Sequence, residues 1–367
     1  MFPRPASNGM RVLMISVDRS RQGILHPGTP AFKRQEAYAR KFGNLDIVGF
    51  SLKRDDATVL AAEKLRVYPT NSLSRLLYGF DALRIALTLP KPDVVTVQDP
   101  FEAGLMGLFV ARVRGVPLHV QVHTDFLSPQ YAQSSFVHRI RVLLAGFVLR
   151  RAARVRVVSQ RVRLSMENRY MLRGPITVLP IFVDTEHFRW NLPDEVLRMR
   201  FNTFSSRVLV VSRLEKEKDV ETAIRVFAEY APITACLIVV GDGSERGYLE
   251  SLVASLDIQH RTFFEGQQDP TSYYKLSDLV LFTSRYDGYG LVIAEALSAG
   301  TPVLSTDVGA ARELGAIVAA SSEEIGQAMV EWFQHGRKEG HLHAYPYENF
   351  EAYVRAYSDD IVACARK

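Results

Sequence analysis

The residues best suited to chemistry in this chain surround a glycine-rich turn in its second half. The turn, Gly288-Tyr289-Gly290, follows an apolar run and precedes a segment of helical period that starts near Leu291. Backbone N–H groups at a helix start lack intrahelical acceptors and carry partial positive charge, so they attract anions. Glycine lets a phosphate group approach the backbone closely. The turn therefore predicts a binding site for a pyrophosphate.

Two carboxylates flank this turn. Asp287 precedes it, and Glu295 lies just over one helical turn beyond its end. A carboxylate at Glu295 can accept hydrogen bonds from both hydroxyls of a ribose, and Asp287 can accept them from the hydroxyls of a bound sugar. The alternative is an ordinary strand–helix turn with one solvated acid on each side.

Two cations follow a different expected strand. Arg213 comes shortly after the run Arg207–Val211, and Lys218 lies in the loop that follows. Both can converge on a diphosphate, because phosphate oxygens form strong hydrogen bonds with cationic side chains. The alternative is a charged surface loop in which Glu215 and Glu217 pair with the lysines.

A third segment, containing Gly241 and Gly243, leads from a strand into a helix. Such a segment fits a nucleotide-binding sheet, and it fits a plain tight turn equally well. No Asp-x-Asp motif stands out, and no cluster of His and Cys has the spacing of metal ligands. The sequence therefore predicts neither a metal nor another cofactor.

Strands and helices alternate along the whole chain. The expected strands are almost entirely apolar, which is typical of parallel sheets covered on both faces. Two such series in tandem predict two doubly wound α/β domains, with a linker near Pro180–Asn191 and a helical segment over Tyr345–Lys367. The expected strands are Arg11–Val17, Leu45–Phe50, Asp93–Gln98, Leu118–His123, Val155–Ser159, Arg207–Val211, Ala235–Gly241, Thr262–Glu265, Leu279–Thr283 and Pro302–Ser305. The expected helices of the first half are Ala31–Phe42, Leu73–Leu87, Phe101–Val113 and Phe136–Arg151.

Ligands of doubly wound sheets bind beyond the carboxyl ends of the strands. The polar residues at those expected ends are Asp18, Asp99, His123, Arg213, Asp242, Arg285 and Asp287. Among them, His123 is either a substrate contact or a strand-end residue whose hydrogen bond is satisfied within the protein.

Together, these motifs resemble the retaining family-4 glycosyltransferases. That family has an acid, Gly-aromatic-Gly, a glutamate, and then Ala-Leu and Gly-x-Pro-Val, and residues 287–303 match this pattern. The family's Arg-Leu-x-x-x-Lys motif falls on Arg213 and Lys218, and its Val-Asp-x-x-x-Phe linker motif falls on residues 183–188. The resemblance runs from Met10 to the last helix and is most specific in the second half.

The resemblance implies the GT-B fold, in which two doubly wound Rossmann-like domains face each other across a cleft. An acceptor-binding domain would span residues 10–182, and a nucleotide-sugar-binding domain would span residues 183–345. Residues 346–367 would pack back on the first domain. The implied reaction moves a hexosyl-type sugar from a nucleotide-diphosphate sugar, most often a UDP-sugar, to a hydroxyl of a glycan or lipid-linked acceptor. Front-face substitution would retain the anomeric configuration without a metal.

The resemblance also assigns roles to single residues. Arg213 and Lys218 would hold the diphosphate, Glu295 the ribose, and His123 would face the sugar. The implied catalytic residues are His123, Arg213, Lys218 and Asp287. The implied donor-binding residues are Arg213, Lys218, Gly241, Gly243, Asp287, Gly288, Tyr289, Gly290, Leu291 and Glu295. The acceptor-side candidates are Gly28, Asp99, His123 and Asp125.

The chain departs from the family at several points, among them a shorter segment after Glu313. Asp287 stands where the family usually has glutamate, and Asp219 follows the motif lysine where the family usually has glycine. The loop containing Gly23 and Gly28 lacks the family's paired glycines. The shorter acid leaves the donor sugar open, and it suggests as an alternative a membrane-associated scaffold that binds nucleotide-sugars without turnover. Because a fold alone does not fix function, an epimerase or phosphorylase of the same architecture is a further alternative.

Positive charge is concentrated in the first half. Lys and Arg number 45 against 40 Asp and Glu, a formal net charge of +5, and the Arg-rich stretch Arg112–Arg173 has only Asp125 and Glu167 as acids. Phe136–Arg151 combines arginines with Val, Leu and Phe at a helical period, a pattern typical of helices at anionic membrane surfaces. Region 136–163 is thus a candidate membrane contact. The alternative is a solvated face with arginine stems lying over the core.

Composition argues against several other classes. The basic stretch lacks the interleaved aromatic residues of a nucleic-acid-stacking surface, so we expect no nucleic-acid partner. The two cysteines form no disulfide framework. No apolar run is long enough to cross a membrane, and residues 1–9 lack the apolar centre of a signal peptide. We expect a cytoplasmic protein that is peripheral on the cytosolic membrane face if the basic helix binds lipid.

Overall fold

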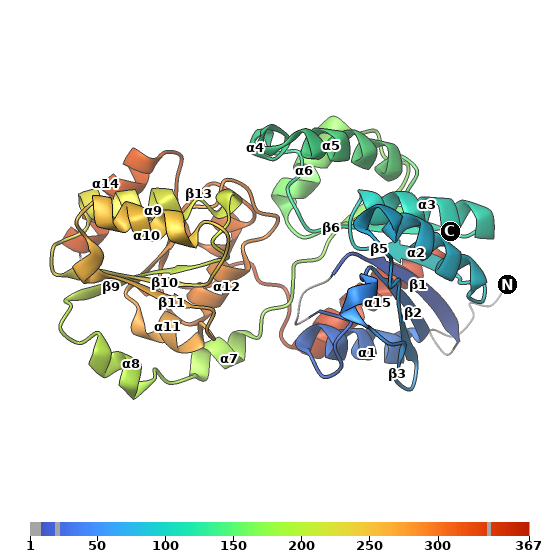
Figure 1. Ribbon diagram of the computed structural model, residues 1–367, viewed down its shortest axis with the longest axis horizontal. Helices are drawn as coiled ribbons and strands as arrows, with labels where there is room; N and C mark the ends of the chain where they lie inside the picture. Colours follow the sequence, from blue (N-terminus) through green and yellow to red (C-terminus); the bar gives the residue numbers. More distant parts are fainter. Residues whose placement is uncertain (1–8, 19–22, 336–338, 367) are drawn as a thin grey trace. The chain divides into compact units, whose positions relative to one another are not determined.

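The computed structural model describes residues 9–18, 23–335 and 339–366. The chain divides into two compact units (Figure 1). Unit 1 comprises the described residues up to Leu179 together with those from Tyr347 onward, and unit 2 runs from Pro180 to Pro346. Each unit is a mainly parallel sheet with helices on both faces.

The sheet of unit 1 has eight strands in the described part of the chain, in the order β3-β4-β2-β1-β5-β6-β7-β8. All neighbouring pairs are parallel except β3 with β4. The strands are β1 (Met10–Ser16), β2 (Gly43–Gly49), β3 (Leu60–Ala61), β4 (Leu65–Pro69), β5 (Val94–Val97), β6 (Leu118–Val122), β7 (Arg154–Val157) and β8 (Ile176–Val178). Strands β5 and β6 are buried at every position, as expected for strands covered on both faces.

The helices of unit 1 form two layers. Figure 1 shows α1 and α15 on one face of the sheet and α2, α3 and α5 on the other. The helices are α1 (Pro30–Phe42), α2 (Tyr78–Thr88), α3 (Glu102–Arg114), α4 (Pro129–Ser134), α5 (Phe136–Leu149), α6 (Gln160–Arg169) and α15 (Phe350–Ala365), with 3-10 turns η1 (Lys53–Asp55) and η2 (Arg75–Leu77). The chain returns from unit 2 through α15, which is capped by Asn349 and packs on α1, β5 and β6.

Two features of unit 1 differ from the sequence-based expectation. The helix expected over Leu73–Leu87 begins only at Tyr78, after η2. Leu73 and Leu76 are 76% and 94% exposed, so the apolar spacing that suggested the earlier start does not reflect core contacts. The strands β3, β4 and β8 were not expected. β3 and β8 have only two and three residues, and β4 lies beside β3 near one edge of the sheet.

Unit 2 has a parallel sheet of six strands among its described residues, in the order β11-β10-β9-β12-β13-β14. The strands are β9 (Ser206–Val211), β10 (Ala235–Val240), β11 (Thr262–Gly266), β12 (Leu279–Phe282), β13 (Val303–Thr306) and β14 (Ile317–Ala319). β9 and β12 are neighbours at the centre, so the loops that follow them meet at one edge of the sheet.

Helices α9, α10 and α14 cover one face of this sheet in Figure 1, and α7, α11 and α12 cover the other. The helices are α7 (Thr185–Trp190), α8 (Glu195–Arg200), α9 (Val220–Tyr230), α10 (Arg246–Ser255), α11 (Thr271–Leu276), α12 (Leu291–Ser298), α13 (Ala311–Leu314) and α14 (Ser322–His335), with 3-10 turns η3 (Lys216–Lys218) and η4 (Gln259–Arg261). The core between α9, α14 and the sheet is apolar; its buried members include Phe227, Leu237 and Met329. This core holds the central strands in place, and with them the loops of the candidate site.

Candidate active site

The centre of the candidate site in unit 2 is an ion pair between two loops. Lys218 Nζ lies 2.8 Å from Asp287 Oδ2, although the two residues are 69 positions apart. Both side chains are largely buried, with 18% and 20% of their surfaces exposed. The Nζ atom also lies 5.9 Å from the centroid of the Phe282 ring, which gives the cation an aromatic face to rest on. One of the two predicted cations, Lys218, therefore meets one of the two predicted acids, Asp287.

Backbone and hydroxyl contacts hold these two loops together. Thr283 Oγ1 donates to the carbonyl of Asp219 at 2.9 Å, and the Arg285 N–H donates to the carbonyl of Glu217 at 2.9 Å. These bonds join the end of β12 to the loop after β9. Lys218 is thus positioned by the main chain on either side of it and not only by its own ion pair.

Asp287 uses its other oxygen on the turn that follows. Its Oδ1 accepts the N–H groups of Tyr289 at 3.0 Å and Gly290 at 2.9 Å. Gly290 has φ of +92°, a left-handed conformation that glycine adopts without strain. The expectation of free amides throughout the turn therefore needs correction, because Asp287 closes the turn itself. Among the described residues, no acceptor is found for the first-turn amides of Leu291 and Val292, which are the groups left for an anion.

Glu295 occupies the second turn of α12 and is half-buried. Its Oε2 accepts the Tyr274 hydroxyl at 2.8 Å, while no partner for Oε1 is found in the described part of the chain. Burial raises the pKa of Glu295 to about 7, against the lowering effect of the Tyr274 hydrogen bond. The side chain therefore has an acceptor oxygen to offer and a charge that changes near neutral pH.

Arg213 behaves differently from Lys218. Its side chain is 69% exposed and pairs with Glu217 at 3.0 Å, four residues along the same loop. Glu215 instead accepts the Ser244 N–H and hydroxyl, which ties this loop to the one after β10. Arg213 therefore behaves as part of a charged surface loop, the alternative to a diphosphate site, whereas Lys218 is shielded and does not.

Gly241 and Gly243 allow the loops after β9 and β10 to touch. A Cβ atom on Gly241 would lie 1.8 Å from the carbonyl oxygen of Ser212, and one on Gly243 would lie 2.4 Å from that of Leu214. The Leu214 N–H donates to the Asp242 carbonyl at 3.0 Å across this contact. The tight-turn interpretation therefore accounts for both glycines, whose effect on the site is to place the loop that carries Lys218.

The acceptor-side candidates lie beyond β1, β5 and β6, which are adjacent in the sheet of unit 1. Asp99 Oδ1 accepts the Phe101 N–H at 2.7 Å just before α3, and burial raises its pKa to about 6. Burial also raises the pKa of Asp125. Gly28 has φ of +80°, and a Cβ atom added there would meet no atom within 4 Å, so this glycine serves the backbone turn before α1. Asp99 thus has a clear local structural role in addition to any role toward a ligand.

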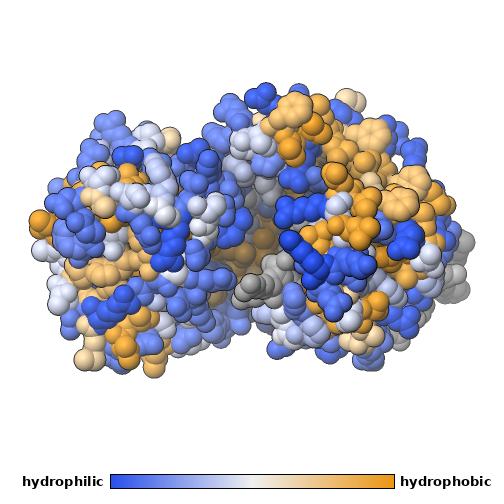
Figure 2. All heavy atoms as spheres, viewed as in Figure 1, coloured by the Kyte–Doolittle hydropathy of each residue, from blue (hydrophilic) through white to orange (hydrophobic). Residues whose placement is uncertain are grey.

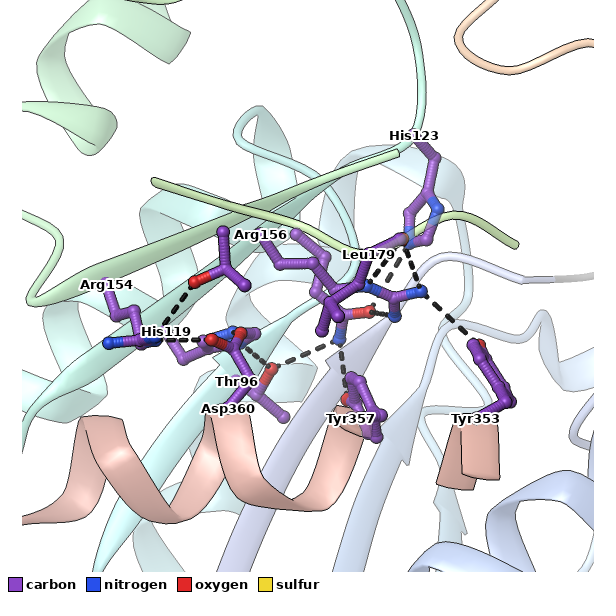
Figure 3. Close-up of polar contacts among 11 residues, drawn as sticks. Thr96, His119, His123, Arg154, Arg156, Leu179, Tyr353, Tyr357 and Asp360 are labelled. Carbon is purple, nitrogen blue, oxygen red and sulfur yellow. Dashed lines mark hydrogen bonds and ion pairs between the residues drawn. The ribbon is translucent and has the colours of Figure 1, made fainter. Parts of the chain in front are cut away.

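His123 is half-buried at the end of β6. Its Nε2 lies 3.4 Å from Gln121 Oε1 (Figure 3). Burial and the positive charges of Arg156 and Arg34 lower its pKa to about 3. The ring is therefore neutral at pH 7, and it has a hydrogen-bond partner inside the protein.

Two family models match the sequence, one on each unit. Residues 6–181 match a glycosyl transferase 4-like domain, and residues 200–316 match the glycosyl transferases group 1. The chain belongs to the family-4 glycosyltransferases of the GT-B fold. The two units, each a mainly parallel sheet with helices between the strands, agree with a two-domain α/β architecture.

The chain is similar in sequence to curated glycosyltransferases, and it shares its fold with solved structures. It is 26% identical over 228 residues to an alpha-monoglucosyldiacylglycerol synthase of Streptococcus pneumoniae, an alignment that covers 58% of this chain and 51% of the relative. It is 35% identical over 113 residues to an N-acetyl-alpha-D-glucosaminyl L-malate synthase of Bacillus anthracis, covering 30% of each chain. The chain thus spans about half or less of the length of these two relatives. The crystal structure of Anabaena HepE with UDP and glucose superposes with a TM-score of 0.68 at 19% identity, covering 97% of both chains, and shows the shared fold.

Some residues of the candidate site were not predicted from the sequence. Tyr274 holds Glu295 from another helix, and no local spacing signals a contact across 21 positions. Gln121 and Arg156 were missed although a signal exists, because polar residues inside otherwise apolar strands need buried partners. Among the described residues, no group of three or more His, Cys, Asp or Glu side chains is arranged to hold a metal ion.

Proposed function

We propose that the chain transfers a hexosyl-type sugar from a nucleotide-diphosphate sugar to a hydroxyl of a glycan or lipid-linked acceptor. The observation that carries this proposal is the assembly at one edge of the unit 2 sheet: the Lys218 ammonium, the Asp287 carboxylate and the start of α12 meet within hydrogen-bond distance. Glu295 lies one turn further along the same helix. A diphosphate needs the cation and the amides, and a ribose needs the carboxylate.

Donor binding exchanges one partner of Lys218 for another. The diphosphate takes the Nζ atom from Asp287 Oδ2, and the freed oxygen then accepts a hydroxyl of the donor sugar. Asp287 keeps its place during this exchange because Oδ1 stays bonded to the amides of Tyr289 and Gly290. Arg213 is exposed enough to turn from Glu217 toward the same phosphates.

The chemical step is a substitution at the anomeric carbon. The bond between that carbon and the diphosphate oxygen breaks, and a bond to the acceptor oxygen forms on the same face. The acceptor proton passes to the departing phosphate oxygen. Lys218 and the α12 amides stabilise the negative charge that develops on the diphosphate, a contribution that is typically a few kcal/mol for each donor. This route retains the anomeric configuration and draws its positive charge from side chains, so it requires no metal.

UDP is the nucleotide we propose for the donor. Support comes from the crystal structure of the similarly folded Anabaena HepE, which holds UDP and glucose. Release of UDP from UDP-hexoses, with the product anomer determined by NMR, tests the activity. A product of inverted configuration would overturn the front-face route. Donor binding without any turnover would favour the scaffold alternative, and free sugar formed without an acceptor would favour an epimerase.

The acceptor is proposed to reside at an anionic membrane surface. Helix α5 exposes an apolar stripe, with Phe136 at 74%, Leu143 at 76% and Ile140 at 48% exposure. These positions recur at helical spacing and therefore lie on one side of the helix. Figure 2 shows apolar side chains gathered over the part of unit 1 where Figure 1 places α3 and α5. We call the exposed apolar residues of these two helices the α3–α5 surface; they are Phe109, Val113, Phe136, Val137, Ile140, Leu143 and Phe147.

Arginines border the α3–α5 surface. Arg151 stacks on Phe147 with its guanidinium carbon 3.8 Å from the ring centroid, and Arg141 pairs with Glu102 on α3. Each arginine close to an anionic leaflet contributes about 1 kcal/mol of attraction. No helix within the described ranges is long and apolar enough to cross a bilayer. The association we propose is that of an amphipathic helix with the membrane surface.

Replacing Leu143 by glutamate is expected to lower binding to anionic vesicles by about tenfold or more. The change removes an exposed leucine whose burial in the interface is worth about 1.5–3 kcal/mol, and it adds a charge of the same sign as the lipid. Co-sedimentation with vesicles of neutral and anionic lipid measures the bound fraction. Ile233→Glu is the matched control, because Ile233 is 80% exposed on unit 2. Equal loss in both variants, or no binding of the native chain to anionic vesicles, would contradict the proposal.

A further inference from the structure

A row of buried polar side chains crosses unit 1 between its sheet and α15 (Figure 3). His119 and Gln121 on β6 lie opposite Arg154 and Arg156 on β7. Facing them from α15 are Tyr353, Tyr357 and Asp360, which are spaced to share one side of the helix. Buried polar groups are costly unless their donors and acceptors match. The direction of each hydrogen bond can therefore be worked out along the row.

Arg156 fixes the direction of the hydrogen bonds at one end of the row. Its guanidinium is fully buried and can only donate, and its Nη1 lies 3.1 Å from the side-chain oxygen of Gln121. The reversed orientation of the Gln121 amide would place N–H against N–H. In the orientation found, the amide nitrogen donates to Tyr357 at 2.9 Å and to Thr96 at 3.2 Å. Gln121 Oε1 is therefore an acceptor that faces Arg156.

The other end of the row requires the same orientation. Arg154 donates to Asp360, and Asp360 Oδ2 lies 2.9 Å from His119 Nε2, so that nitrogen carries a proton. Burial lowers the pKa of His119 and keeps the ring neutral. Its Nδ1 must then accept the Thr96 hydroxyl at 2.9 Å, which leaves the Thr96 oxygen to accept from Gln121. Both arginines thus impose one consistent set of proton positions.

The orientation of the Gln121 amide determines which nitrogen of His123 carries the proton. The oxygen that accepts from Arg156 is also the atom 3.4 Å from His123 Nε2, so this ring nitrogen must donate. Burial of the ring and the positive charges of Arg156 on β7 and Arg34 on α1 disfavour a second proton. The other titratable group that acts on the ring is His119 on β6. A neutral ring protonated at Nε2 carries no proton at Nδ1.

We propose that Gln121 and Arg156 are positioning residues that hold His123 in its neutral, Nε2-protonated form, so that Nδ1 presents a hydrogen-bond acceptor to a hydroxyl of the sugar. This inference rests on the proposed glycosyl transfer. It makes His123 a residue that recognises a hydroxyl, and it excludes a role in which the imidazole donates a proton to the leaving group. Arg156 is itself anchored, because it also donates to the Leu179 carbonyl at 3.2 Å and to the Tyr353 hydroxyl at 3.4 Å.

The ring state is measurable by NMR of the full chain labelled with ¹⁵N in its histidine rings. Between about pH 6 and pH 8, the His123 signals are expected to show a protonated Nε2 and an unprotonated Nδ1. Saturating donor or acceptor sugar is expected to shift the Nδ1 signal. A native ring that is protonated at Nδ1 at pH 7 would overturn the positioning claim. An Nδ1 signal unmoved by a donor and an acceptor that demonstrably bind would overturn the recognition claim.

Gln121→Glu is the decisive variant. A carboxylate facing Nε2 stabilises the doubly protonated ring, so His123 is expected to carry a second proton at pH 7, whereas the native ring gains it only near pH 3. Turnover is expected to fall about tenfold, since one hydrogen bond to a hydroxyl is lost. Tyr353→Phe removes a hydroxyl from Arg156 without touching Gln121, and it is expected to leave the ring signals as in the native chain.

The spectrum separates this inference from the proposed function. Native signals of the expected form in a chain that turns over no donor would leave the positioning claim standing and would sink the proposed transfer. A folded Gln121→Glu chain with an unchanged His123 spectrum would refute the positioning claim even if the chain is an active transferase. If that variant does not fold, the spectrum of the native chain decides the claim by itself.

Discussion

Replacing Lys218 by alanine is expected to lower kcat/KM for the donor by about 10²- to 10³-fold, the usual effect of removing one preorganised donor from developing negative charge. The Nζ atom is held 2.8 Å from Asp287 and is mostly shielded from water. A shielded cation interacts with a phosphate more strongly than an exposed one does. Release of the nucleoside diphosphate over a range of donor concentrations measures the effect.

Lys216 provides the matched control for this substitution. It lies in the same 3-10 turn and is exposed, so Lys216→Ala is expected to change kcat/KM little. Lys218→Ala should remain folded, because Asp287 keeps its two backbone donors when the ammonium is lost. Equal effects of the two alanine variants would show that Lys218 does not hold the diphosphate.

Donor affinity is expected to rise with pH across the range around 7 in which Glu295 ionises. The pKa of Glu295 is raised to about 7 by burial, and the ionised carboxylate is the stronger acceptor for two ribose hydroxyls. Hydrogen bonds to a charged group are worth about 1.5–3 kcal/mol against about 0.5–1.5 for neutral ones, so affinity should change about tenfold between pH 6 and pH 8. Calorimetric titration with UDP at several pH values measures this change.

The free energy of unfolding should fall as Glu295 ionises, whereas donor affinity rises. The folded pKa of Glu295 lies above its ordinary value of 4.5, so the folded state binds the proton more tightly than the unfolded chain does. The stabilising effect of this proton is fully present below about pH 4.5 and is lost as the pH rises through about 7.

Two variants separate Glu295 from other titrating groups. Glu295→Gln is expected to flatten the pH dependence of UDP affinity at a low value. Tyr274→Phe removes the hydrogen bond that favours the ionised form, so it is expected to move the rise in affinity to higher pH. A native pH profile in the Gln variant would show that Glu295 does not contact the nucleotide.

Strands with a continuous apolar run were predictable from the sequence, and several short strands near the sheet edges were not. Ala235–Gly241 was expected to be a strand, because a short continuous apolar run bounded by glycine is typical of a buried strand. The observed strand β10 spans Ala235–Val240. β14 has three residues, and β3 has two, so neither leaves a periodic pattern to detect. At the start of α2, exposed leucines mimicked the period of a buried face.

The sequence was sufficient to predict which residues belong to the candidate site. It was not sufficient to predict the contacts between them. Lys218 and Asp287 were each chosen from local motifs, but their ion pair depends on β9 and β12 being neighbours in the sheet. The bonds from Asp287 to the amides of Tyr289 and Gly290 are local, and the short aspartate side chain favours such turns. The Arg213 contact with Glu217 depends on how exposed the loop is, which no motif records.

The most direct test of the donor site is a thermal-shift panel of UDP-, GDP-, ADP- and dTDP-sugars on the native chain, Lys218→Ala and Glu295→Ala. A ligand at about 100 times its Kd stabilises the folded state by about 2.7 kcal/mol, so millimolar donor gives a clear shift. We predict a shift with one nucleotide in the native chain, strongly reduced in both variants. No shift with any of the four at millimolar concentration, or an equal shift in all three chains, would contradict a donor site built from Lys218, Asp287 and Glu295.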